Sequence, residues 1–184
     1  LRAIPQLHLY RPADANEVVD CWRSAVTYQE GPSALVFTRQ GVPTLDRDAY
    51  DQIGGPQRGG YVLADASNGD PEAVLLSTGS EVHLCIEARE QMEADGIPTR
   101  VVSMPCWELF EQQDDEFRET VLPSNVGARL AVEAASPQGW RKWVGDEGDI
   151  LGIDRFGASA PWETNYEKFG FTPENIAARA RDLI

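Results

Sequence analysis

The chain has 184 residues, of which 42% are hydrophobic, and a formal net charge of −14 from 30 acidic and 16 basic residues. Such a charge repels phosphate backbones and anionic membranes, so we expect neither nucleic acid nor a membrane as a partner. No stretch approaches the roughly 20 apolar residues of a membrane span and no secretory leader opens the chain, which predicts a soluble protein. The sequence begins at Leu1 without a methionine, so we expect it to be part of a longer polypeptide.

The first 40 residues predict an extended segment, a helix and a strand. Residues 4–10 are expected to be extended, because the proline of Arg11-Pro12 biases the residue before it away from helix. The helix has Asp14 as its N-cap and Glu17 placed to reach back to it. Apolar residues recur at helical spacing on one face of this helix, at Val19, Trp22 and Val26. This unit is too short to be a domain, so we expect the rest of its sheet to lie outside the chain.

Residues 34–38, Ala-Leu-Val-Phe-Thr, predict a strand that ends at Arg39. A run that is apolar on both pleat faces suits a parallel strand covered by helices on both sides. The carboxyl ends of strands open onto the ligand crevice in open α/β sheets, so the Arg39 guanidinium is a candidate for binding a phosphate or carboxylate. A structural ion pair is the alternative, and the local sequence leaves both open.

Residues 41–59 are rich in glycine and proline and predict a connector that crosses a domain boundary. Two strands follow at 60–64 and 73–77, and the short link at 68–71 favours an antiparallel pair between them. A helix is expected from 78 to about 95, with Gly96 at its end.

The remaining sequence alternates strands and helices. It predicts strands at 99–104, 128–133 and 150–153, two short helices within 106–121, a short helix around 139–144, and a final helix with Thr172 as N-cap and Pro173 in its first turn. The pattern predicts an α/β fold: a mostly parallel sheet with one antiparallel edge strand, helices on both faces, and the tail of a second α/β domain before it.

Two turns carry candidate sites. Thr78-Gly79-Ser80-Glu81 joins a strand to a helix, where backbone N–H groups can cradle an anion, although Glu81 would repel a phosphate and we favour an ordinary N-cap. Residues 154–161 place small side chains after a strand end, which suits a binding loop or the close approach of a neighbouring subunit.

Histidines, cysteines and aromatic residues give weaker signals. His83 shares a helical stripe with Glu87 and Glu90, which is typical of a solvated face, and we expect His8 to cap a loop. The cysteines form no C-x-x-C pair, which indicates reduced, packed thiols in a cytoplasmic protein, and no cluster has the spacing of a zinc site: Cys21, Cys85 and Cys106. The aromatic residues of the last third are expected in the core or at an interface: Trp140, Trp143, Phe156, Trp162, Phe169 and Phe171.

Seven segments in order resemble the C-terminal part of the transketolase family, over essentially the whole chain. They are Tyr10–Asp14, Thr38–Gln40, Arg58–Leu63, Thr78–Val82, Arg100–Pro105, Gly152–Ser159 and Phe169–Pro173. The resemblance implies that residues 1–56 are the C-terminal end of a pyrimidine-binding domain with its linker, and that residues 57–184 are the transketolase C-terminal domain.

The same resemblance implies a function. The full-length enzyme would use thiamine diphosphate and a divalent cation, Mg or Ca, to transfer a two-carbon ketol unit from ketose phosphates to aldose phosphates. It would be a cytoplasmic homodimer of the pentose phosphate pathway and the Calvin cycle. Arg39 matches the arginine that holds the sugar phosphate, although the family's Ser-Arg-Gln-Asn is here Thr-Arg-Gln-Gly.

Other parts of the family's site are missing from the sequence. The Asp-Gly-Pro-Thr-His stretch would lie just before Leu1, with Arg2 resembling the end of that signature, and the cofactor-activating glutamate and the metal-binding domain are also absent. We therefore expect the isolated chain to bind no cofactor or metal and to be inactive. The alternatives are a stand-alone, non-catalytic interaction or regulatory module, and the related pyruvate dehydrogenase β-type subunits.

Overall fold

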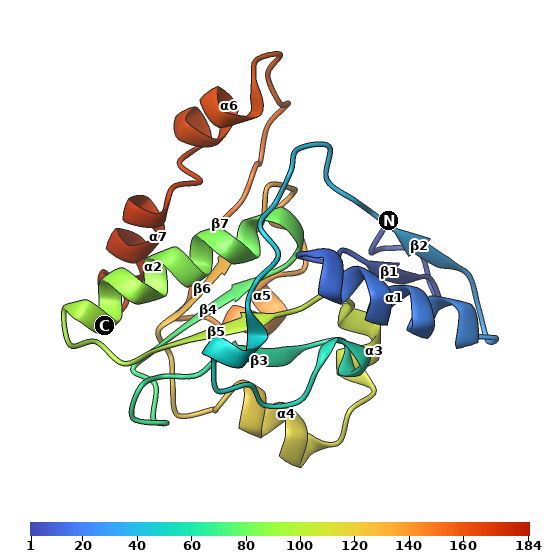
Figure 1. The fold of residues 1–184 in the computed structure, drawn as a ribbon, viewed down its shortest axis with the longest axis horizontal. Coiled ribbons are helices and arrows are strands. Elements are labelled where there is room, and N and C mark those ends of the chain that lie inside the picture. Colours follow the sequence, from blue (N-terminus) through green and yellow to red (C-terminus); the bar gives the residue numbers. More distant parts are fainter.

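The computed structural model describes residues 1–184 and contains two sheets (Figure 1). The smaller sheet pairs β1 (His8–Tyr10) with β2 (Ser33–Leu35) in parallel, and α1 (Ala15–Thr27) joins the two strands. The strand expected to reach Thr38 therefore ends at Leu35. Its partner β1 stops at Tyr10, since the Arg11 amide donates to the carbonyl of Pro105 in the other sheet's loop instead.

Helix α1 begins as its sequence predicts. The Asp14 side chain accepts from the Glu17 amide at 2.9 Å, while the Glu17 carboxylate reaches back to the Ala13 amide at 2.7 Å. The buried residues of the helix are Glu17 and Cys21, whereas the apolar stripe lies on the opposite, exposed side: Val19, Trp22 and Val26. This stripe is exposed to solvent in this chain.

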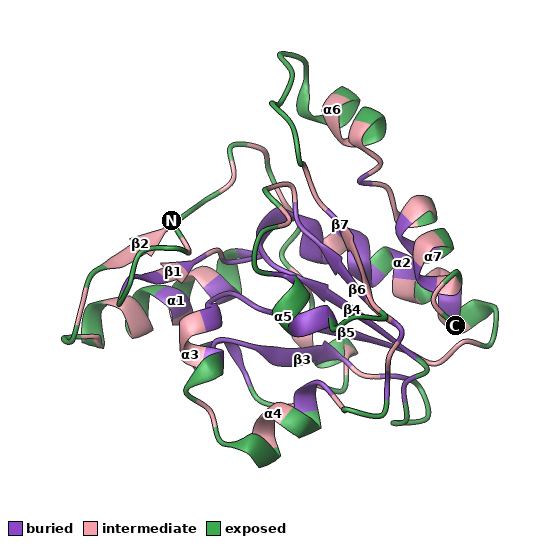
Figure 2. Cartoon of the chain, turned by 180° about the vertical axis from the view of Figure 1, so that it is seen from behind, coloured by how far each residue is buried: buried purple, intermediate pink, exposed green.

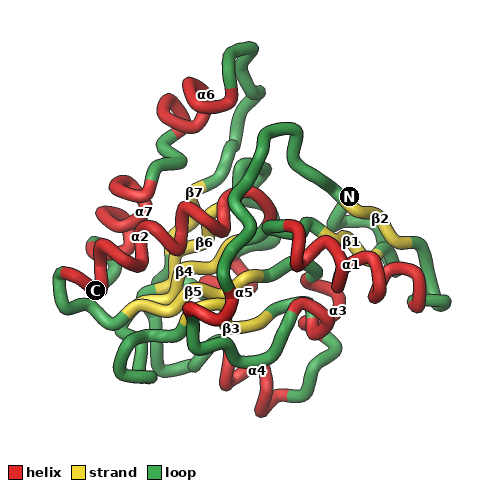
Figure 3. The backbone as a smooth tube through the Cα atoms, in the orientation of Figure 1, coloured by secondary structure: helices red, strands yellow, loops and turns green.

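The larger sheet has five strands in the order β3-β5-β4-β6-β7 (Figure 3). Their bounds are Tyr61–Ala64 for β3, Ala73–Ser77 for β4, Thr99–Ser103 for β5, Arg129–Val132 for β6 and Asp149–Leu151 for β7. All neighbouring pairs are parallel except β3 with β5, so the expected antiparallel edge strand is present.

The expected antiparallel pairing of β3 with β4 is wrong, because β3 pairs with β5. Both edges of β4 are taken by parallel neighbours, and the whole strand is buried. Just after β3, the Asp65 carboxylate forms a two-point ion pair with Arg100 of β5, at 2.7 and 3.1 Å. This contact fixes β3 beside β5, and the 68–71 turn carries the chain across to the sheet centre.

Helices cover both faces of the sheet, as predicted, and the strands between them are buried except for the first two residues of β7 and the first of β6 (Figure 2). One face packs against α2 (Val82–Ala94) and α7 (Pro173–Arg181) around Leu75, Met92 and Ile176. The other packs against α3 (Trp107–Glu111), α4 (Asp115–Val121) and α5 (Arg141–Val144) around Leu76 and Trp140. Two apolar layers of this kind make one α/β domain.

The connector, the turn before α2 and the region before α7 contain elements that periodicity did not predict. Three short 3-10 turns lie at η1 (Arg47–Ala49), η2 (Pro56–Arg58) and η3 (Gly79–Glu81). Helix α6 (Trp162–Phe169) has no fully buried residue, although Tyr166 and Phe169 pack partly buried against the core, and it projects away from the sheet (Figure 1). No helix in residues 1–184 is long and apolar enough to span a membrane.

Candidate functional site

Arg39 lies four residues beyond β2, in an irregular segment, and its side chain is exposed. It belongs to none of the ion pairs of the chain, so the structural ion pair considered for it is not formed. It lines a cavity of about 340 Å³ between residues 37–40 and the segment that carries α6. The cavity wall also includes the polar side chains of Arg11, Ser80, Asn165 and Tyr166.

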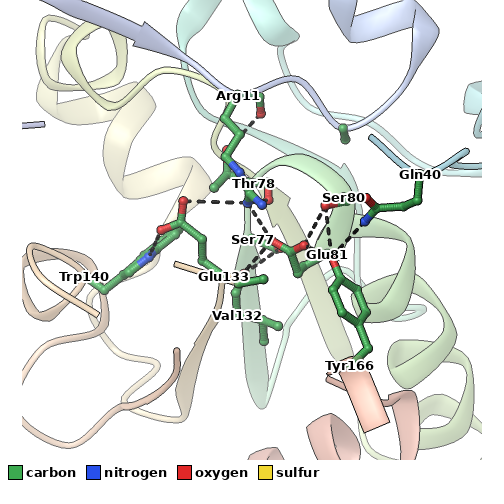
Figure 4. Close-up of polar contacts among 12 residues, drawn as sticks. Arg11, Gln40, Ser77, Thr78, Ser80, Glu81, Val132, Glu133, Trp140 and Tyr166 are labelled. Atoms are coloured by element: carbon green, nitrogen blue, oxygen red, sulfur yellow. Dashed lines mark hydrogen bonds and ion pairs between the residues drawn. The ribbon is translucent and has the colours of Figure 1, made fainter. Parts of the chain in front are cut away.

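A buried carboxylate, Glu81 at the end of η3, hydrogen-bonds to three side chains that line this cavity: Arg11, Ser80 and Tyr166 (Figure 4). Its Oε2 atom accepts from Arg11 Nη1 at 2.5 Å and from the Ala134 amide at 3.0 Å. Its Oε1 atom accepts from the hydroxyls of Ser80, at 2.6 Å, and of Tyr166. Burial alone would raise the pKa of Glu81, but the Arg11 ion pair and the hydroxyl donors outweigh it and hold the pKa below its ordinary value.

The Thr78–Glu81 turn hydrogen-bonds to the Arg11 segment, and none of its backbone amides donates to the Glu81 carboxylate. The Thr78 hydroxyl donates to the Arg11 carbonyl at 2.9 Å and does not cap a helix amide, so the expected N-cap is wrong. Gly79 has φ +67°, and its amide donates to the same carbonyl at 2.9 Å. The turn thus binds the Arg11 segment through both its backbone and its side chains.

A second buried carboxylate, Glu133, follows β6 and binds the other arginine of the N-terminal segment. Arg2 forms a two-point ion pair with it, at 2.6 and 2.7 Å, while Arg11 lies 3.6 Å away. The Trp140 indole N–H donates to Glu133 at 2.7 Å, and the Arg2 guanidinium lies 3.8 Å from the Trp107 ring centroid. Both carboxylates sit at the carboxyl ends of parallel strands, where polar side chains collect.

The sequence alone did not identify the pairing of these two carboxylates with Arg2 and Arg11. The available signal was that Glu133 follows directly on an apolar strand and Glu81 stands four residues after another, while two arginines occur within the first eleven residues. Which arginine meets which carboxylate depends on how the two sheets lie together. Only the folded chain decides that.

Of the two histidines, His8 takes a different place from the one expected, and His83 lies on the expected face with exposed Glu87 and Glu90. His8 lies in β1, buried and stacked on the Tyr28 ring at 3.6 Å between centroids, so it does not cap a loop. His83 is half-buried on α2, and burial lowers its pKa. No group of three or more His, Cys, Asp or Glu side chains is placed to hold a metal ion in residues 1–184.

The aromatic residues divide between core and surface. Trp140, Trp143 and Phe171 are buried, as expected, and Phe169 is partly buried beside the core. Phe156 in the 154–161 loop is 96% exposed, and Trp162 on α6 is also exposed. The loop that was expected to shape a binding site or meet a subunit therefore presents a large apolar side chain to solvent.

Comparison with known protein families supplies the decisive observation. The family described as "Transketolase-like TK C-terminal domain" matches residues 59–172, and "Transketolase, pyrimidine binding domain" matches residues 1–44. The chain belongs to the transketolase family. This also decides against the pyruvate dehydrogenase β-type subunits.

Individual transketolases are similar over the whole chain. Those of Geobacillus stearothermophilus and Bacillus subtilis are 50% and 47% identical over 184 residues, which is 100% of this chain and 28% of each relative. The chain thus spans about a quarter of the length of these relatives. It corresponds to the end of the transketolase pyrimidine-binding domain and the C-terminal domain.

Solved transketolases share this fold. An enzyme from Pichia stipitis in complex with sedoheptulose-7-phosphate has a TM-score of 0.88 at 36% identity, and that of Leishmania mexicana 0.89 at 34%; each similarity covers at least 99% of this chain and 26% of the other. A split-gene transketolase described as an inactive β4 tetramer resembles 99% of this chain and 59% of its own with a TM-score of 0.74, at 22% identity, which is a likeness of fold alone.

Proposed function

We propose that this chain is the C-terminal part of a thiamine diphosphate transketolase that moves a two-carbon ketol unit from ketose phosphates to aldose phosphates, as a cytoplasmic homodimer. In that enzyme Arg39 binds the substrate phosphate. The supporting observation is that Arg39 is exposed, has no carboxylate partner and lines a cavity, in a chain whose net charge is −14. A guanidinium of this kind is free to form two parallel N–H···O bonds to a phosphate.

Arg39 would act by positioning the sugar-phosphate substrate. The reacting carbon of a sugar phosphate is several bonds from the phosphate, so a contact at Arg39 holds the substrate without touching the bond that breaks. Thiamine diphosphate, when bound by the full enzyme, supplies the carbanion chemistry. In residues 1–184, no group of three or more His, Cys, Asp or Glu side chains is placed to hold a metal ion. We propose that the isolated 184-residue chain is inactive and binds neither thiamine diphosphate nor Mg or Ca tightly.

Steady-state kinetics of the full-length enzyme test the role of Arg39. Arg39→Ala should raise KM for a phosphorylated aldose roughly tenfold to a hundredfold, the loss expected for a charged hydrogen-bonded contact, and leave kcat nearly unchanged. Arg118→Ala is the matched control, because Arg118 is a surface residue of α4 whose ion-pair partner is its neighbour Asp115. An unchanged KM in the Arg39 variant would refute the assignment.

The mass of the natural protein tests the larger proposal. A species several-fold heavier than 20.3 kDa supports a complete transketolase that contains this chain. A stable species near 20.3 kDa would instead support the stand-alone, non-catalytic module. Calorimetry with thiamine diphosphate and Mg on the 184-residue chain tests the cofactor expectation, and tight binding would overturn it.

A further inference from the structure

The segment that carries Arg39 is held by a single hydrogen bond. Before it, the Val36 amide donates to the Tyr10 carbonyl at 2.8 Å, and after it, the Leu45 amide donates to the Asp14 carboxylate at 3.0 Å. From residue 37 to residue 44, the one hydrogen bond that reaches another segment runs from Gln40 Nε2 to the Tyr166 hydroxyl, at 3.1 Å. The only other bond is internal, from Thr38 to the Gln40 carbonyl.

The Tyr166 hydroxyl is itself fixed by Glu81 (Figure 4). Since Glu81 is held in its ionised form, it can only accept, so the hydrogens of both Ser80 and Tyr166 point at its Oε1 atom. The Tyr166 oxygen then has lone pairs left, and one of them faces the Gln40 amide. The carboxylate thus turns the hydroxyl into an acceptor aimed at the residue next to Arg39.

The cluster connects regions that lie far apart in the sequence. Tyr166 is on α6 and Glu81 on η3, both in the C-terminal domain, whereas Gln40 and Arg11 belong to the pyrimidine-binding part. Arg11 locks Glu81 in place through its ion pair and also donates from Nη1 to the Thr78 carbonyl at 2.5 Å. The buried Arg11–Glu81 ion pair therefore holds the Tyr166 hydroxyl in place, and this hydroxyl makes the single hydrogen bond to Gln40.

We propose that Tyr166, supported by Glu81, is a positioning residue for Arg39, and that the C-terminal domain thereby tunes binding of the substrate phosphate. The inference rests on the proposed role of Arg39. In this role Tyr166 touches neither the phosphate nor the reacting atoms; it orders the segment from which the guanidinium extends.

Tyr166→Phe in the full-length enzyme removes the hydroxyl and keeps the ring, which packs against Phe171 and Trp162 at 5.5 and 5.4 Å between centroids. KM for a phosphorylated aldose should rise about three- to tenfold, the worth of one neutral hydrogen bond, with kcat unchanged. KM for an unphosphorylated hydroxyaldehyde should not change. Tyr50→Phe is the matched control, since that half-buried hydroxyl makes no hydrogen bond to another side chain or to the backbone.

A second variant removes the other partner. Gln40→Met deletes the amide donor at nearly constant volume and leaves the Glu81 cluster intact, so it should give the same rise in KM as Tyr166→Phe. In an Arg39→Ala background, Tyr166→Phe should have no further effect, because the group that it positions is gone.

The outcomes separate the two proposals. If Arg39→Ala leaves KM unchanged, the proposed function itself fails. If Arg39→Ala raises KM but neither Tyr166→Phe nor Gln40→Met does, the positioning role is overturned and the phosphate contact stands. Equal losses with phosphorylated and unphosphorylated substrates, or additive effects with Arg39→Ala, would also overturn it, because both indicate a general structural role.

Discussion

Glu81→Gln is the substitution that most directly tests the charge network at the junction of the two parts. The carboxylate accepts from four donors, of which Arg11 Nη1 and the Ala134 amide cannot reverse their roles. A glutamine has one oxygen for those two donors. Its NH2 group must face Ser80 and Tyr166, whose hydroxyls can rotate to accept. The volume and the four hydrogen-bond contacts can survive, two of them with donor and acceptor reversed, and the negative charge is lost.

The expected cost follows from the burial of Arg11. Removing one partner of a buried ion pair costs about 3–5 kcal/mol, because the remaining charge is left uncompensated. The side chain of Arg11 is 15% exposed, and Glu133 lies 3.6 Å from it and compensates part of its charge. We therefore expect a loss near the lower limit, about 3 kcal/mol in the free energy of unfolding.

Glu17→Gln provides the matched control. Glu17 is also a buried carboxylate with three donors, the Ala13 amide and the hydroxyls of Tyr61 and Ser103, but it has no ion-pair partner. Burial raises its pKa, and the hydrogen bonds oppose this only in part. Replacing it by a neutral amide leaves no unpaired charge, so we expect a loss of about 1 kcal/mol or less.

The two carboxylates also predict opposite pH dependences. The pKa of Glu81 is lowered on folding, so its contribution is present above the ordinary value of 4.5 and is lost as the pH falls through the folded-state pKa. The pKa of Glu17 is raised, so its contribution is present below 4.5 and is lost as the pH rises through the folded-state pKa. The difference between wild type and E81Q should therefore shrink in acid, whereas E17Q should gain on wild type as the pH rises.

Urea unfolding followed by tryptophan fluorescence between pH 3 and pH 8 measures both effects. The m-values of the variants should equal that of the wild type, which shows that the unfolded and folded states keep their compactness. Equal losses for E81Q and E17Q at pH 7, or a constant E81Q deficit down to pH 3, would refute the charge argument.

Two further predictions concern the backbone and the thiols. Gly79→Ala should cost at least about 1 kcal/mol more in the free energy of unfolding than Gly69→Ala, measured by thermal unfolding. Both glycines have positive φ. An added Cβ at Gly79 would lie 2.7 Å from the Arg11 guanidinium carbon, whereas Gly69 has open space around it. An equal loss would contradict the close approach. Burial raises the pKa of all three cysteine thiols, so iodoacetamide at pH 7.5 should alkylate none of them in the folded chain and all three in urea: Cys21, Cys85 and Cys106. Rapid modification of the folded chain would contradict their burial.

Local signals in the sequence predicted most of the elements. Asp14 caps α1 and Thr172 caps α7, and Gly96 follows the end of α2 with φ +81°. Each of these signals depends on a few neighbouring residues, so no tertiary information is needed to read it. The alternation of strands and helices likewise predicted the parallel sheet with helices on both faces.

Pairings between distant segments could not be read in the same way. The short link at 68–71 favoured β3 beside β4, but the Asp65–Arg100 ion pair places β3 beside β5. The spacing of apolar residues in α1 predicted an apolar face, but this spacing cannot indicate whether another element packs against that face. In this chain the stripe that contains Trp22 is exposed.

The sequence by itself determined the family, the order of the elements and the candidate arginine, because motifs and caps are properties of short stretches. Only the tertiary structure determined which distant residues lie near the Arg39 segment. Glu81 and Tyr166 are 42 and 127 residues further along the chain, and only the packing of the small sheet against the strand ends of the large one brings them to Gln40. These groups form hydrogen bonds to one another only in the folded state, because there the Glu81 carboxylate is buried and must be satisfied by protein donors instead of water.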